Sequence, residues 1–264
     1  MSQKKTRVAV YIRSEGPNPR AIKDGLSWLD SVCKSTGKHS ALLAFLGKEQ
    51  SQDVMSEVVG KDLAKALAKS GHLKLPNSAA ALSLMTERDR PFSCDGPALV
   101  VYPNKKLLDV VDSLFGVTHV LVIPWTLKEI QYWIDTWNAY ELGTQPAKPT
   151  KRLVSNPVVE EALKDLTATV NVSTGLSHPL DRASAIDLFR KLKAAGEHFD
   201  PEEVRAWLVA EGNWNPEDAD DVANVAKGII EGKRFKETRS RWRNDIVNIW
   251  KEEAGKGKTE SATS

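Results

Sequence analysis

The chain has 264 residues, which allows one large domain or two modest ones, and its 41% hydrophobic and 27% charged content is typical of a globular protein. Its 37 basic and 35 acidic residues give a formal net charge of +2, so no overall field attracts nucleic acid or an anionic membrane. No apolar run approaches the roughly 18 residues of a membrane span, and none follows Met1 as a signal peptide requires. The two cysteines are too few for a disulfide framework or a thiolate zinc site, so we expect a cytoplasmic protein that keeps them reduced.

Short apolar runs in the first half of the chain indicate strands that are buried on both faces. They occupy residues 7–13, 40–46, 98–103 and 118–124, and amphipathic helical stretches separate them at residues 19–35, 104–115 and 127–141. This repetition of strand and helix predicts an α/β fold, a Rossmann-like open parallel sheet of four or five strands with right-handed crossovers.

The connection between the second and third of these runs is unusually long. Its apolar spacing predicts one helix over residues 52–70 and another over residues 78–87. An insertion of this size acts as a lid, as a dimer face or as extra packing on the sheet, and the sequence leaves these alternatives open.

Three prolines and a glycine within residues 143–157 indicate a linker, so we expect the α/β domain to occupy residues 1–150. A short helix is predicted at residues 157–166. Apolar and polar residues then alternate over residues 167–173, a pattern that fits a fifth strand. If that strand forms, the α/β domain extends to residue 175.

Strong helix signals predict a C-terminal helical domain over residues 151–254. Asp200, Pro201 and Glu203 supply an N-cap, a proline in the first turn and a glutamate able to bond back to the cap. Further helices are predicted at residues 216–231 and 236–253. The polar residues 255–264 are expected to form a disordered tail.

In an open α/β sheet, ligands bind at the loops that follow the carboxyl ends of the strands. None of these loops carries a Gly-x-Gly-x-x-Gly turn or a Walker lysine, so we predict no cofactor. Two lysines in the first turn of a predicted helix oppose its dipole, which favours a bound anion unless both point to solvent. A tryptophan in a neighbouring loop offers a stacking surface or packs internally, and an asparagine and a threonine have the pattern of N-caps. The candidate ligand-binding residues are Arg13, Asn104, Lys105, Lys106, Trp125 and Thr126.

Charge is segregated in the C-terminal part of the chain. Residues 197–221 contain nine acidic residues against Arg205, whereas residues 233–243 are basic. The basic block fits contact with nucleic acid or an acidic protein, or pairing with the acidic stretch in the same chain or a neighbouring subunit. We favour the pairing, because the net charge of the whole chain is close to zero. The candidate partner-binding residues are Lys233, Arg234, Lys236, Arg239, Arg241 and Arg243.

No set of residues has the spacing of a known active site, and the five histidines lie too far apart to predict a metal site. The first hypothesis is therefore a non-enzymatic binding or scaffold protein whose helical part associates with a protein partner or a second copy. An alternative is an enzyme that acts on an anionic small molecule at the carboxyl ends of the strands. A second alternative is weak, sequence-independent binding of nucleic acid by residues 233–243.

Overall fold

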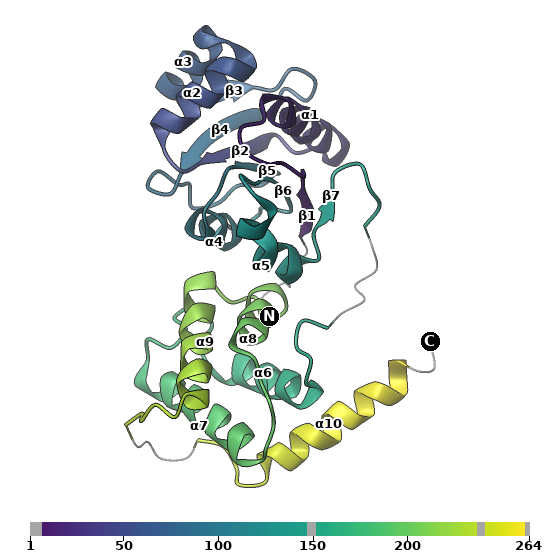
Figure 1. The fold of residues 1–264 in the computed structure, drawn as a ribbon, viewed down its shortest axis with the longest axis vertical. Coiled ribbons are helices and arrows are strands. Elements are labelled where there is room, and N and C mark those ends of the chain that lie inside the picture. The colour runs from purple at the N-terminus through teal and green to yellow at the C-terminus, as the bar shows by residue number, and fades with distance from the viewer. Residues whose placement is uncertain (1–6, 147–151, 237–240, 262–264) are drawn as a thin grey trace. The chain divides into compact units, whose positions relative to one another are not determined.

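A computed structural model of the protein describes residues 7–146, 152–236 and 241–261. The chain divides into two compact units, one formed by residues 6–148 and the other mainly by residues 149–264 (Figure 1). The first unit is α/β and the second is helical. Among the described residues, no helix has the length and apolar character needed to cross a membrane.

The α/β unit is built on a seven-stranded sheet in the order β3-β4-β2-β5-β6-β1-β7. Every pairing is parallel except that between β3 and β4 at one edge. The four predicted strands are confirmed as β1, β2, β5 and β6, and three further strands extend the sheet. In the Rossmann order the first and second strands are neighbours, whereas here β5 and β6 lie between β1 and β2. The strands are β1 (Val8–Tyr11), β2 (Ser40–Phe45), β3 (His72–Lys74), β4 (Ala81–Thr86), β5 (Ala98–Val101), β6 (His119–Ile123) and β7 (Tyr140–Glu141).

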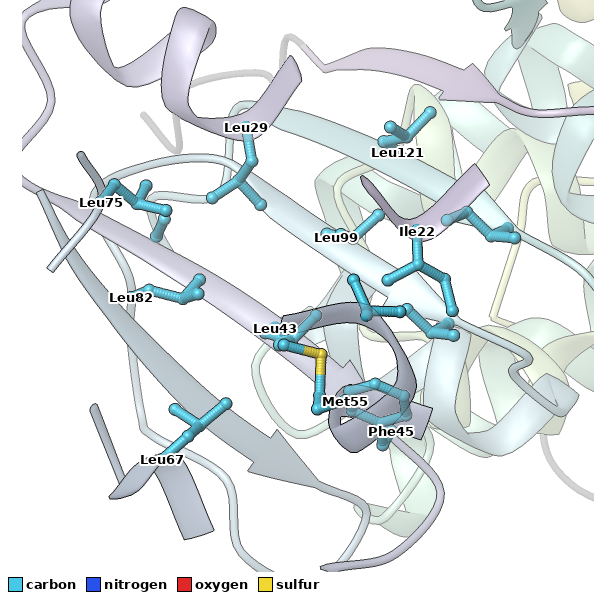
Figure 2. Close-up of a cluster of buried hydrophobic side chains, with 14 of the residues drawn as sticks. Ile22, Leu29, Leu43, Phe45, Met55, Leu67, Leu75, Leu82, Leu99 and Leu121 are labelled. Atoms are coloured by element: carbon cyan, nitrogen blue, oxygen red, sulfur yellow. The ribbon is translucent and has the colours of Figure 1, made fainter. Parts of the chain in front are cut away.

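Helices cover both faces of this sheet, which explains why its inner strands are apolar without alternation. Side chains of α1 (Pro19–Thr36), α2 (Lys48–Val59) and α3 (Lys61–Ser70) form one core with the strands. Figure 2 shows Leu29, Met55 and Leu67 from these helices gathered against residues of β2, β4, β5 and β6. On the opposite face, α4 (Lys105–Ser113) and α5 (Leu127–Trp137) form a second core.

Two predictions for the long connection are wrong. The helix expected over residues 52–70 is two helices, because Gly60 adopts a φ of 90° between α2 and α3. The helix expected over residues 78–87 is instead β4, whose backbone pairs with β2 along all six of its residues. Tertiary pairing has overridden local helix preference here.

The helical unit contains α6 (Pro157–Thr169), α7 (Pro179–Ala194), α8 (Pro201–Ala210), α9 (Pro216–Ile230) and α10 (Ile246–Ser261). The fifth strand considered at residues 167–173 does not form, because α6 continues to Thr169 and buries Leu166 and Val170. Asp200 caps α8 as predicted, but the Glu203 carboxylate accepts hydrogen bonds from Ser155 rather than from the cap backbone.

The last helix lies further along the chain than predicted. Of the range 236–253, residues 237–240 are outside the described residues, and α10 begins only at Ile246. Trp242 precedes the helix and packs edge-on against Trp250, with ring centroids 5.8 Å apart. Helix α10 continues to Ser261, so the tail expected to be disordered from residue 255 is helical over most of its length. Its inner face packs on α6.

Candidate functional site

The carboxyl edge of the parallel sheet contains a point where the chain turns in opposite directions. Strands β1 and β6 are neighbours, but β1 leads into α1 on one face and β6 leads into α5 on the other. Neighbouring loops diverge at such a point, which is where ligands of open α/β sheets bind. The two loops at this point, which follow β1 and β6, contain residues 12–18 and 124–126.

Trp125 lies at this point and is held firmly although 45% of its surface is exposed. Its carbonyl oxygen accepts a 2.8 Å hydrogen bond from the Gly16 N–H, which joins the β6 and β1 loops. Its indole meets the ring of Tyr102 edge-on, with centroids 5.4 Å apart and an interplanar angle of 81°. The Tyr102 hydroxyl accepts a 2.6 Å hydrogen bond from the Asn18 N–H at the start of α1. Three loops therefore fix one exposed aromatic ring.

Tyr102 has a backbone conformation that bulky residues rarely adopt. Its φ is 48°, in the left-handed region, and it is buried directly after β5. A conformation of this kind costs about 1–3 kcal/mol and persists where its surroundings determine it, often at functional sites. Tyr102 was not among the predicted site residues, and its signal in the sequence is an aromatic residue followed by proline at the end of a buried strand.

Both lysines at the start of α4 have carboxylate partners. Lys105 Nζ lies 2.7 Å from Asp109 Oδ2, and Lys106 Nζ lies 3.3 Å from Glu87 Oε2. Asn104 caps the helix by accepting a hydrogen bond from the N–H of Leu107, as its pattern predicted, and its amide donates to Glu87 at 2.7 Å. These acids offset the positive charge at the helix start, so the lysines need no bound anion there.

The remaining candidates of this edge lie in the two loops beside Trp125. Thr126 and Glu129 form the predicted capping box of α5. Arg13 has an exposed side chain whose Nε lies 3.4 Å from Glu141 Oε2, a weak surface pair. The structure thus places Arg13, Trp125 and Thr126 on the neighbouring ends of β1 and β6, while the lysines after β5 are balanced by Asp109 and Glu87.

The second candidate region is a group of exposed cations between α9 and α10, which we call the basic strip: Lys233, Arg234, Lys236, Arg241 and Arg243. Arg239 belongs to the same predicted block but lies outside the described residues. The strip's backbone is fixed on α7, because Arg190 donates to the Phe235 carbonyl and the Asp187 carboxylate accepts from the N–H groups of Arg241 and Trp242. The cationic side chains are therefore presented on an anchored segment.

Within the described chain, the basic strip does not pair with residues 197–221 as we expected. Arg243 pairs with Asp245 at 2.7 Å instead. The acids at the start of α9 are separated from the strip by the whole helix, whose 15 residues span about 22 Å. Glu197, nearer the amino end of the acidic stretch, lies 3.0 Å from Lys251. The intrachain form of the pairing is thus wrong for these residues.

A buried ion pair in the α/β unit was also missed. Arg7 and Asp112 are in contact with side chains only 1% and 4% exposed, and the Trp133 and Trp137 indoles donate to the same carboxylate. Burial raises the pKa of Asp112, and the guanidinium and the two indoles oppose that shift. Such a buried network is structural, although the Nε of Arg7 has no hydrogen-bond partner in it. Across the described residues, no group of three or more metal-ligating side chains is assembled.

Comparison with known proteins identifies only the helical unit. Residues 155–251 match a family described as a domain of unknown function (DUF1889). No curated protein and no solved structure matches the chain. The match covers α6 to α9 and the beginning of α10, including the basic strip, so this unit is similar to a family whose description assigns no activity.

Proposed function

We propose that the protein is a non-enzymatic binding or scaffold protein whose helical unit associates with a second copy of the chain. The observation that supports this proposal is the separation of opposite charges along α9. Acidic residues cluster at its amino end, and the basic strip follows its carboxyl end. Within the unit Arg205 pairs with Asp220 at 2.5 Å, but the basic strip lies a helix length from the acidic end, so the charge pattern of one copy is complementary to that of another.

The acidic end contains the exposed side chains of Glu211, Glu217 and Asp221, beside the half-buried Asp218. Burial, with Asp221 and Glu217 nearby, raises the pKa of Asp218, as expected where carboxylates lie close together. A basic strip from another copy would relieve this repulsion. Exposed ion pairs contribute little each, so the association is weak, concentration-dependent and sensitive to salt.

The contact joins two different surfaces, an acidic one on one copy and a basic one on the other. This difference permits a complementation experiment. Reversal of the strip with R241E/R243E, or of the acidic end with E217K/D221K, should each abolish association measured by analytical ultracentrifugation at about 50 mM salt. An equal mixture of the two variants should associate again, because the first variant keeps the native acidic end and the second keeps the native basic strip.

The control is K61E/K65E, which reverses two exposed lysines of α3 in the other unit and should leave association unchanged. A wild-type protein that remains monomeric at high concentration and low salt would refute the proposal. A gel shift with nucleic acid at about 150 mM salt, lost in R241E/R243E, would instead support phosphate binding by the strip.

A further inference from the structure

We propose a binding site for an uncharged planar heteroaromatic molecule, with the chemistry of a nucleobase, on the exposed face of Trp125. The site is independent of the association proposed for the helical unit. It lies between the loops that follow β1 and β6, where the chain continues to opposite faces of the sheet.

The indole is exposed, while its backbone is hydrogen-bonded and one side of its ring is supported. The Gly16 N–H fixes its backbone, and the edge of Tyr102 supports its ring. An aromatic surface that is supported before the ligand arrives binds a flat ring with less further ordering than an unsupported one. Stacking on such a surface tolerates different ring systems because every base has a π-face.

The residue that supports this ring has a strained backbone conformation. Tyr102 keeps a left-handed φ of 48°, and its hydroxyl is tied to the N–H of Asn18. A glycine would adopt this backbone conformation without strain, but it could not support Trp125. The strained tyrosine therefore positions the platform, and it does so from the position directly after the central strand β5.

The charges at the carboxyl edge of the sheet bear on the charge of the ligand. Three lysines at the carboxyl edge, Lys48, Lys105 and Lys106, have carboxylate partners at 2.8, 2.7 and 3.3 Å. A phosphate arriving at these lysines would have to displace a carboxylate and meet its negative charge. Arg13, in the β1 loop beside Trp125, likewise has the Glu141 carboxylate 3.4 Å from its Nε. The edge therefore favours the neutral ring over a phosphorylated form of the same ring.

The test uses adenosine and AMP as probes and saturation-transfer NMR of the full chain. We expect adenosine to bind, W125A to weaken it by about tenfold or more, and W125F to retain most of the binding. F115A is the matched control, since Phe115 is 75% exposed in the same unit but precedes β6 and so lies toward the opposite edge. It should bind adenosine like the wild type.

Each result bears directly on the proposal. Adenosine binding that W125A leaves intact, or that F115A lowers equally, overturns the site, as does no binding of adenosine at millimolar concentration. AMP binding tenfold tighter than adenosine overturns the uncharged ligand class. Because the variants lie in the α/β unit, failure here leaves the self-association of the helical unit untouched and separately measurable.

Discussion

Replacement of Asp112 with alanine tests the buried network most directly. The change leaves the Arg7 guanidinium, 1% exposed, without its carboxylate, and it removes an acceptor that Trp137 reaches at 3.0 Å and Trp133 at 3.4 Å. Breaking a buried pair by removing one partner costs about 3–5 kcal/mol, and each unpaired buried donor adds to this. We expect D112A to lower the free energy of unfolding by about 4 kcal/mol.

The measurement is urea unfolding of the full chain, with hydrogen exchange of the amides in β1 and α4 to assign the loss to the α/β unit. The double variant R7M/D112L removes both charges and should lie within about 2 kcal/mol of the wild type. A loss below about 1 kcal/mol for D112A would mean that the guanidinium reaches water, which refutes this account.

Three further changes are predicted at other positions. Burial raises the pKa of Asp30, but hydrogen bonds from the loop before β4 outweigh this effect, so the pKa of Asp30 is lowered in the folded protein. The ionised Asp30 therefore stabilises the fold above an ordinary aspartate pKa of about 4, and this stabilisation is lost as the pH falls through the lower folded value. Acid titration of unfolding should show a smaller loss in D30N than in the wild type. N104A should cost about 1 kcal/mol through the lost cap, and N104D should recover little of it, because a second carboxylate would face Glu87; thermal unfolding measures both. G96A would place a methyl group 1.8 Å from the Ser40 carbonyl oxygen and should destabilise the unit by about 2 kcal/mol or more, whereas an unchanged melting temperature would contradict the packing of β5 beside β2.

The inner strands were predictable because a strand that is buried on both faces has apolar residues at nearly every position. Leu43 and Phe45 pack on one side of β2, and Leu42 and Ala44 pack on the other, so the run is apolar without alternation. Edge strand β7 has only two residues and no such signal, so it was absorbed into a predicted helix. Prediction succeeded where local pattern and tertiary environment agreed.

Residues 78–87 show the opposite case, in which a distant residue decides the structure. The Asp30 carboxylate in α1 accepts hydrogen bonds from the N–H groups of Asn77 and Ser78 and fixes the turn that delivers β4 to β2. The sequence of the segment contains alanine and leucine at a helical spacing, and nothing in it refers to Asp30. Local periodicity cannot predict that contact, because Asp30 lies in a distant part of the sequence.

The candidate sites depend on the fold in the same way. Trp125 was identifiable as a tryptophan in a loop, but its rigidity comes from Tyr102 and Gly16, which reach it through two other strands. In the sequence the acidic stretch ends at residue 221 and the basic block begins at residue 233, and this short distance favoured the prediction that they pair within the chain. The rise of the helix converts that short sequence distance into about 22 Å, so the same residues that look self-neutralising in sequence are left facing outward in structure. Under the proposed self-association, complementary charges at the two ends of this helix meet between copies of the chain, so salt and charge reversal, rather than a change in folding stability, should reveal their role.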